Sequence, residues 1–170
     1  MDDLEIKREE PGGSRSDRGA VVQLLADENA AHGFPVTWQM TCFILRDSDG
    51  DVQGGFIGET HWGWLHVNVL AVASPHRGRG WGGRLLARGE AWAMENACHH
   101  AYLTTTSFQA RPFYEQRGYH VAGKLPNFPL GETLYLMAKE LDSQTTVPTN
   151  DFSGPPNDGN LQSLGKRHTG

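Results

Sequence analysis

The stretch PHRGRGWGGRLL, at residues 75–86, constrains the fold of this chain more than any other segment. Its glycines satisfy both G-x-G-x-x-G and R-x-x-G-x-G. Residues 64–72 alternate as in a strand over most of their length, and residues 83–97 have helical spacing. A glycine turn between a strand and a helix lets backbone N–H groups approach phosphate oxygens at the positive helix N-terminus. The segment therefore predicts a site for a phosphate-bearing ligand.

The elements around the loop decide which kind of phosphate ligand fits. A dinucleotide-binding fold places its glycine fingerprint after the first strand of a βαβ unit, with an acidic residue about 20 positions further on for the ribose. Here three strand-like runs precede the loop, and the strand-like run after the helix, HAYLTTTSF, ends without a carboxylate. The context therefore disfavours a nicotinamide dinucleotide and leaves only the local phosphate-binding geometry.

The order of the segments predicts a mixed sheet in a single domain. Breaker-rich residues 11–19 predict a loop before an amphipathic helix, and the DSDG sequence at residues 47–50 predicts a hairpin turn. Strands are predicted at 37–47, 51–62, 64–72, 100–108, 119–125 and 133–141, and helices at 20–33, 83–97 and 109–118. The predicted fold class is α/β, with a mixed, mostly antiparallel sheet flanked by helices. Residues 1–142 form the domain, and residues 143–170, poor in large apolar side chains, are predicted to be a disordered tail.

Composition limits the partners of the chain. A formal net charge of −5 leaves no broad basic face for nucleic acid or an anionic membrane, so an anion site must be local. Cys42 and Cys98 are far apart, and the N-terminus MDDLEIKREE lacks both a cationic start and an apolar core, which predicts a reduced, cytoplasmic protein. No apolar run approaches the roughly 18 residues of a membrane helix. Composition does not exclude that the chain forms a homodimer.

Two motifs together resemble those of the GNAT superfamily of acetyl-CoA-dependent N-acyltransferases. The first, R/Q-x-x-G-x-G/A between a strand and a helix, is present as RGRGWG at residues 77–82. The second, A-x-x-F-Y-E-x-x-G-Y after a strand, is present at residues 110–119. The two motifs lie in the family's order and spacing, and the resemblance covers residues 36–141. It implies the GNAT-like acyl-CoA N-acyltransferase fold, with acetyl-CoA as co-substrate.

The resemblance also implies which residues bind the cofactor. Backbone groups at residues 70–72 would pair with the pantetheine arm, and amides at residues 77–83 would hold the pyrophosphate. Family members often carry asparagine three positions before the motif alanine, whereas Ser107 stands there in this chain and its hydroxyl can replace part of that contact. Trp81, between the glycines, is expected to pack beneath the following helix. The cofactor-binding candidates are therefore Leu70, Ala71, Val72, Arg77, Gly78, Arg79, Gly80, Trp81, Gly82, Gly83 and Ser107.

Acyl transfer to an amine requires a base, because an alkylamine with a pKa of about 10.4 is protonated at neutral pH. His66, on the polar face of a central strand, is the candidate base, with a histidine merely hydrogen-bonded inside the sheet as the alternative. Its place resembles that of a working Glu or His in histone and arylalkylamine acetyltransferases. Asn68 can orient the amine, and Glu59 and His61 are reserve bases. Tyr114, in the second motif, is the candidate acid for the departing thiolate because a phenol stays protonated at neutral pH.

The predicted function is transfer of an acetyl group from acetyl-CoA to a primary amine of a small molecule, by direct attack in a ternary complex. No Ser or Cys is placed as a nucleophile for a covalent intermediate. No metal is predicted, because adjacent histidines at 99 and 100 cannot easily share one and DSDGD lacks the other ligands of a calcium loop. Acetylation of a protein lysine or N-terminus, and a non-catalytic acyl-CoA sensor, stay open as alternatives. Acceptor specificity is expected in residues 20–35 and 126–132.

Overall fold

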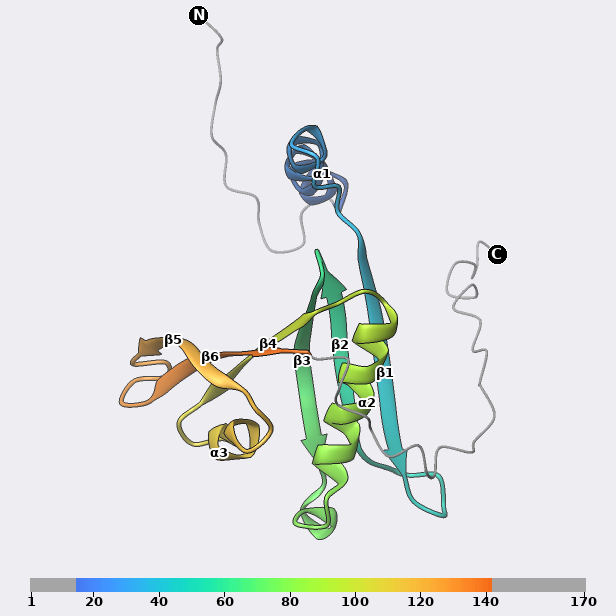
Figure 1. Ribbon diagram of the computed structural model, residues 1–170, viewed down its shortest axis with the longest axis vertical. Helices are drawn as coiled ribbons and strands as arrows, with labels where there is room; N and C mark the ends of the chain where they lie inside the picture. The colour runs from blue at the N-terminus through green and yellow to red at the C-terminus, as the bar shows by residue number, and fades with distance from the viewer. Residues whose placement is uncertain (1–14, 142–170) are drawn as a thin grey trace, which may run out of the picture.

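The structure is a computed structural model and describes residues 15–141 of the 170-residue chain. The segment predicted to be a disordered tail lies outside the described residues. The helices are α1 (Arg15–Ala31), α2 (Trp81–Glu95) and α3 (Arg111–Glu115), with a short 3-10 helix η1 (Ser74–His76) before α2. The strands are β1 (Trp38–Arg46), β2 (Val52–His61), β3 (Trp64–Val72), β4 (His100–Thr106), β5 (His120–Pro126) and β6 (Thr133–Glu140). They form a six-stranded sheet in the order β1-β2-β3-β4-β6-β5, which confirms the predicted mixed α/β fold (Figure 1).

Strands β1 and β2 are joined by the predicted hairpin turn. The Asp47 carboxylate accepts the Gln53 side-chain amide at 2.6 Å and the backbone N–H groups of Asp49 and Asp51 at 3.1 and 2.9 Å. The Gln53 bond, followed by the backbone bonds, holds the pKa of Asp47 below its ordinary value. Gly50 takes a φ of 89°, which glycine adopts without steric cost. The turn prediction is confirmed.

Strands β3 and β4 are the parallel pair of the sheet, and α2 connects them. Residues 64–67 pair with residues 100–103. Beyond this point β3 continues along β2 as far as Val72, while β4 continues along β6 as far as Thr106. The two strands therefore pair at their amino ends and not at their carboxyl ends, which creates an opening within the sheet.

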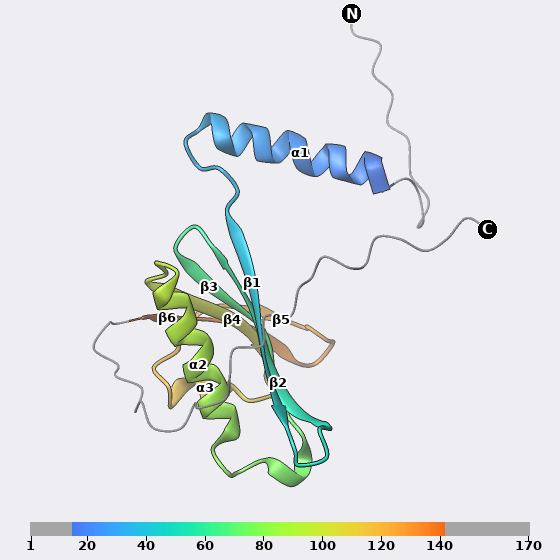
Figure 2. The same ribbon diagram turned by 90° about the vertical axis from the view of Figure 1, so that its right-hand side faces the viewer.

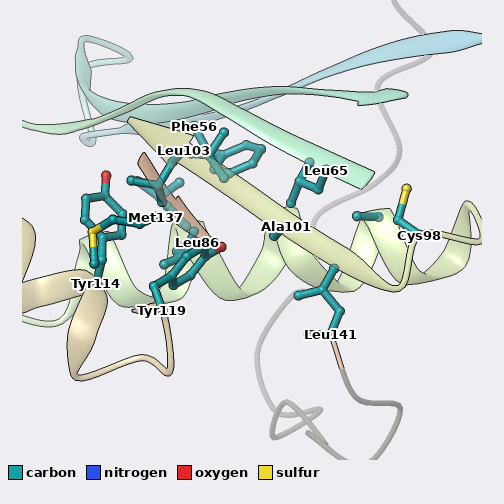
Figure 3. Packing of buried hydrophobic residues seen from close by; sticks show 13 residues of the cluster. Phe56, Leu65, Leu86, Cys98, Ala101, Leu103, Tyr114, Tyr119, Met137 and Leu141 are labelled. Carbon is teal, nitrogen blue, oxygen red and sulfur yellow. The ribbon is translucent and has the colours of Figure 1, made fainter. Parts of the chain in front are cut away.

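The core lies between the sheet and the helices α2 and α3 (Figure 3). Phe56, Leu65 and Met137 supply fully buried side chains from the sheet, and Leu86 supplies one from α2. Helix α2 approaches β2 closely at Gly89, where an added Cβ would lie 2.3 Å from the Phe56 ring. A glycine at this position is therefore what allows α2 to pack this near the sheet.

A buried carboxylate ties α2 to the far half of the sheet. Glu90, on α2 and 8% exposed, accepts a hydrogen bond from the Tyr119 hydroxyl at 2.9 Å and from Lys139 Nζ at 2.8 Å. Lys139 lies on β6, and Tyr119 directly precedes β5. Because both carboxylate oxygens are paired, the buried charge is compensated.

Helix α1 begins earlier than predicted. The expectation of a loop through residue 19 is wrong, because α1 starts at Arg15. Its first turn contains Asp17, whose carboxylate interacts favourably with the positive end of the helix dipole. None of the helices within residues 15–141 is long and apolar enough to cross a membrane.

Helix α1 lies beyond the end of the sheet (Figure 2). Its apolar side chains are exposed to solvent. These exposed side chains are Val21, Val22, Leu24 and Leu25, at 64–71% exposure. The segment between α1 and β1 is anchored to the β2–β3 turn, where the Trp62 indole N–H donates to the Pro35 carbonyl at 3.0 Å. The Phe34 ring meets the same indole edge-on at 6.3 Å between centroids.

Candidate active site

A cavity of about 1010 Å³ lies where β3 and β4 separate. Its walls are residues 67–72 of β3, the glycine-rich loop with the first turn of α2, the end of β4, and α3 with its flanking residues. Most of the predicted cofactor-binding residues line it, namely Leu70, Ala71, Val72, Arg77, Gly78, Gly80, Trp81, Gly82 and Gly83. Arg79 and Ser107 are not among its lining residues. The glycine-rich loop and the carboxyl half of β3 thus meet at one cavity.

The glycine-rich loop is shaped for a ligand that approaches the backbone. Gly78 and Gly80 have φ values of 72° and 84°, a region that side chains disfavour. A Cβ built on either glycine would meet no atom within 4 Å, so the space beside both is open. Gly80 is also the N-cap of α2, and the N–H groups of the first helical turn have no intrahelical partners. Such a loop can bind an anion through its amides.

The arginines and the tryptophan of the loop have distinct surroundings. Arg77 Nε donates to the Val72 carbonyl at 2.8 Å and so fastens the loop to the end of β3. The Arg84 guanidinium lies 4.9 Å from the centroid of the Trp81 ring, one helical turn away. Trp81 is half-buried, lines the cavity and stays outside the buried core. The expectation that it packs beneath α2 is wrong, because its ring pairs with Arg84 instead.

Arg117 lines the cavity although the motif pattern leaves it unspecified. Its guanidinium lies 3.6 Å from the centroid of the Phe113 ring and donates to the Phe113 carbonyl at 2.8 Å. A Cβ on Gly83 would come within 2.7 Å of the same guanidinium, which therefore lies against the first turn of α2. Arg117 follows Phe113 by one helical turn, and that spacing is the sequence signal that identifies it.

The end of β4 is fixed by two side chains with different roles. The Ser107 hydroxyl hydrogen-bonds the Glu132 carboxylate and accepts the backbone N–H of Thr133 at 3.0 Å. Gln109, which lines the cavity and was missed, accepts the backbone N–H of Thr106 at 2.9 Å. Ser107 therefore supports the connection to β6, and the structure does not bring it to the cavity.

Tyr114 of α3 lines the cavity from the core side of the sheet. The residue is 8% exposed, and Figure 3 shows its ring beside Tyr119 and Met137. Its ring packs edge-on against Phe113 at 5.0 Å and against Tyr119 at 5.8 Å between centroids. Burial raises the pKa of the Tyr114 phenol, so the hydroxyl stays protonated at neutral pH.

His66 points to the opposite side of the sheet. Its neighbours Leu65 and Val67 are buried under α2, so strand alternation directs His66 to the other face. His66 Nδ1 lies 3.3 Å from Glu59 Oε1, and the imidazole stacks on the Tyr102 ring at 4.4 Å with an interplanar angle of 1°. His66 does not line the cavity.

Asn68 connects His66 to the cavity. It lines the cavity, and its amide donates to Glu59 Oε1 at 3.4 Å and lies 3.3 Å from His66 Nδ1. A bulge between Ile57 and Gly58 leaves Asn68 without a register partner on β2. Bulges of this kind redirect side chains near functional sites. The bulge therefore places one polar side chain at the border between the cavity and the opposite face.

The remaining predicted residues lie apart from the cavity. The His61 ring packs edge-on against Trp62 at 4.1 Å, and the His100 ring stacks on Trp64 at 4.5 Å. Within the described part of the chain, no three His, Cys, Asp or Glu side chains gather closely enough to hold a metal ion. Cys42 is exposed and Cys98 is buried, and both are free thiols.

A mixed sheet that opens at its parallel pair, with a glycine turn and a helix N-terminus at the opening, has the architecture of acyl-CoA N-acyltransferases. The acetyltransferase (GNAT) family model matches residues 14–119. A blasticidin-S acetyltransferase of Streptomyces morookaense is 44% identical over 93 residues, which are 54% of this chain and 68% of that protein. The chain belongs to the GNAT family and is an acetyltransferase.

Solved structures agree with this assignment. The crystal structure of an acetyltransferase from Bacillus cereus ATCC 14579 matches with a TM-score of 0.71 and 26% identity, over 79% of this chain and 98% of that chain. The crystal structure of nourseothricin acetyltransferase matches with a TM-score of 0.55 and 25% identity, over 61% of this chain and 66% of that chain. The similarity therefore extends over most of the described residues.

Proposed function

We propose that this acetyltransferase transfers an acetyl group from acetyl-CoA to a primary amine of a small molecule, by direct attack in a ternary complex. The cavity between the separated ends of β3 and β4 is the observation that carries the proposal. It brings a loop suited to phosphates and a buried phenol to one space. The relative named as a blasticidin-S acetyltransferase supports a small-molecule acceptor.

The residues around the cavity fit the polar parts of acetyl-CoA, which would supply the activated acetyl thioester. Amides at residues 77–83 would hold the pyrophosphate, since Gly78 and Gly80 leave open space beside the loop. Residues 69–72 of β3 have a strand partner on the β2 side and none on the β4 side. That free edge can hydrogen-bond an extended arm as an added strand would. Arg117 would add positive charge near the phosphates.

His66 would accept the proton of the attacking amine. The scheme assigns His66 the tautomer that carries its proton on Nδ1 and donates it to Glu59, with the Asn68 amide donating to the same carboxylate rather than to Nδ1. Nε2 is then unprotonated and able to accept a proton. Because His66 lies on the face opposite α2, the amine would approach from that face, with Asn68 beside it at the border of the cavity. Glu59 is a positioning residue in this scheme.

Tyr114 would protonate the departing thiolate. The amine nitrogen forms a bond to the acetyl carbon while the carbon–sulfur bond breaks. His66, directly or through a water, takes one proton from the ammonium before attack and releases it to solvent, and the nitrogen loses a second proton by the same route as the amide forms. The thiolate sulfur takes the phenol proton. Tyr114 then recovers its proton from solvent. The raised pKa of Tyr114 ensures that the proton is present at neutral pH.

CoA binding is tested with a matched pair of glycine substitutions. Gly80 and Gly33 have the same φ of 84° and equally open surroundings, but only Gly80 lines the cavity. Gly80→Ala and Gly33→Ala therefore introduce the same backbone strain, and only the first puts a methyl group into the phosphate loop. CoA at 100 times its Kd should stabilise the wild type and Gly33→Ala by about 2.7 kcal/mol in thermal shift. Gly80→Ala should bind about 10- to 100-fold more weakly, for loss of a charge-assisted hydrogen bond.

Acetyl transfer is tested by thiol release from acetyl-CoA with amino acids, polyamines, aminoglycosides, nucleoside amines and peptides as acceptors. Turnover with a small-molecule amine supports the proposal, and turnover restricted to peptides would assign the protein-acetylating alternative. Equal CoA affinity in Gly80→Ala and Gly33→Ala would show that the phosphates bind elsewhere. CoA binding without turnover on any acceptor would leave the sensor function instead.

A further inference from the structure

The sheet face opposite α2 carries an unusual concentration of rings, and we call it the open face. It comprises two register rows: Trp38, His61, Trp64 and His100 in the first, and Met40, Glu59, His66 and Tyr102 in the second. In the described residues α2 and α3 lie on the other side of the sheet, and α1 lies beyond its end (Figure 2). Trp38 and Trp64 are 56% and 36% exposed, and Met40 is 60% exposed.

The rings of the open face are ordered by the pairing of β3 with β4. Trp64 is the register partner of His100, and their rings stack at 4.5 Å with an interplanar angle of 20°. His66 is the register partner of Tyr102, and these rings are parallel at 4.4 Å. Cross-strand partners thus form two short stacks side by side. A flat ligand can extend such a stack without reordering it.

The open face also holds one negative charge suited to a cation. Glu59 lies between Met40 and His66 in its row, and its side chain is 30% exposed. Within residues 15–141 its ion-pair partner is His66, and no lysine or arginine pairs with it. Exposed aromatic rings beside a carboxylate attract an ammonium group through the ring faces and the charge together. An apolar cover such as the α1 side chains would bury this carboxylate without a cation, which is costly.

We propose that the open face binds the acceptor, and that the acceptor is a primary amine attached to a flat unsaturated ring. The inference rests on the proposed function, because it names the substrate class of the same site. Asn68 connects the open face to the cavity, because it lines the cavity and hydrogen-bonds Glu59 on the open face. The flat ring stacks on the aromatic rows, and the ammonium lies near Glu59. After loss of its proton, the nitrogen faces the opening between β3 and β4.

Two amines of matched size separate stacking from simple apolar burial. Benzylamine has a flat ring, and cyclohexylmethylamine has a saturated ring that is more hydrophobic. Each is titrated into 15N-labelled protein saturated with CoA, and the indole N–H resonances report binding and its location. Both amines carry the same ammonium group, so stacking of the flat ring alone predicts about 2- to 12-fold tighter binding of benzylamine. An apolar surface alone predicts the reverse order.

Substitutions at Trp64 and Glu59 test whether the open face is the source of the preference for benzylamine. Trp64→Phe should keep the preference for benzylamine, and Trp64→Leu should remove or reverse it. Glu59→Gln should weaken both amines to the same degree, since both carry the same charge. Melting temperatures of the variants identify any that do not fold. If one does not fold, the test is decided by the titration of Trp64→Phe and by the ratio of the two amines' affinities for the wild type.

The outcomes separate this inference from the proposed function. Equal or weaker binding of benzylamine, or absence of binding by both amines, overturns the inference while CoA binding and thiol release still decide the proposed function. Burial of the open face in a dimer would appear as protected indole resonances together with a doubled mass in light scattering. Burial under α1 would appear as protected indole resonances with contacts from α1 and an unchanged mass. Either result also overturns the inference.

Discussion

Replacing Gly89 by alanine tests how closely α2 is packed on the sheet. The added Cβ would lie 2.3 Å from the Phe56 ring, where ordinary van der Waals contact begins at 3.4 Å. Phe56 is fully buried, and a Cβ on Gly58 would lie 2.8 Å from the same ring, so the ring is wedged between two glycines. Overpacking of this kind costs about 1–3 kcal/mol, and the better helix propensity of alanine offsets about 1 kcal/mol. We expect a net loss of up to about 2 kcal/mol and a fall in Tm of up to about 8 °C, with Gly89→Ala about 1–3 kcal/mol less stable than a helical glycine-to-alanine variant that meets no overlap.

The measurement is denaturant unfolding followed by circular dichroism, with Gly19→Ala as the matched control. Gly19 is also helical, and its added Cβ meets no atom within 4 Å, so no loss of stability is expected there. Phe56→Leu should relieve the overlap, so the double variant Phe56→Leu/Gly89→Ala should be more stable than the sum of the single losses by about 1 kcal/mol. Equal stability of Gly89→Ala and Gly19→Ala, with strictly additive single losses, would refute the reasoning.

Three further outcomes follow from burial. Tyr114→Phe should lower kcat by about 10- to 1000-fold in a thiol-release assay with little change in CoA affinity, because only the hydroxyl is removed. Burial and then the adjacent Glu90 raise the pKa of Tyr119, so this group stabilises the fold below pH of about 10 and the stabilisation is lost as pH rises further. Urea unfolding of Tyr119→Phe should therefore show a shallower alkaline loss than that of the wild type. Ellman's reagent should modify the exposed Cys42 rapidly and Cys98 only on unfolding, since burial also raises the pKa of the Cys98 thiol.

The strands and helices that the sequence specifies locally could be predicted well. The Asp-Gly turn and the strand at residues 64–72 depend on neighbours along the chain, and both predictions are confirmed. The alternation holds as far as Val67 and then shifts by one residue at the bulge, which leaves Val69 exposed. The start of α1 differs from the prediction because the breaker-rich composition of residues 11–19 predicts a loop, whereas the first turn of the helix forms around Asp17. The packing of Trp81 also differs from the prediction, because a motif pattern does not reveal that the Arg84 guanidinium lies over its ring.

The candidate site was predictable where a motif, or the strand that leads into one, contains it. The cavity-lining glycines and Tyr114 belong to the two motifs, and the structure brings both motifs to one cavity. The contact of His66 with Glu59 depends on the register of β2 against β3, which a bulge shifts between Ile57 and Gly58. Nothing in the local sequence fixes the position of that bulge, because a one-residue shift in register exchanges the two faces of a strand.

The opening between β3 and β4 is maintained by the strength of pairing on either side of it. Strand β3 pairs with β2 along nearly its whole length, and β4 pairs with β6 from His100 to Thr106, whereas β3 and β4 pair only at residues 64–67 and 100–103. Two half-sheets thus meet along a short seam, and α2 crosses from one to the other. Its glycine at position 89 packs on Phe56 of the first half, and Glu90, the next residue, is held by Lys139 of the second. Because the helix that presents the phosphate loop also fixes the two halves relative to each other, the loop and the opening keep one geometry. The same residues that stabilise the fold therefore preorganise the cavity.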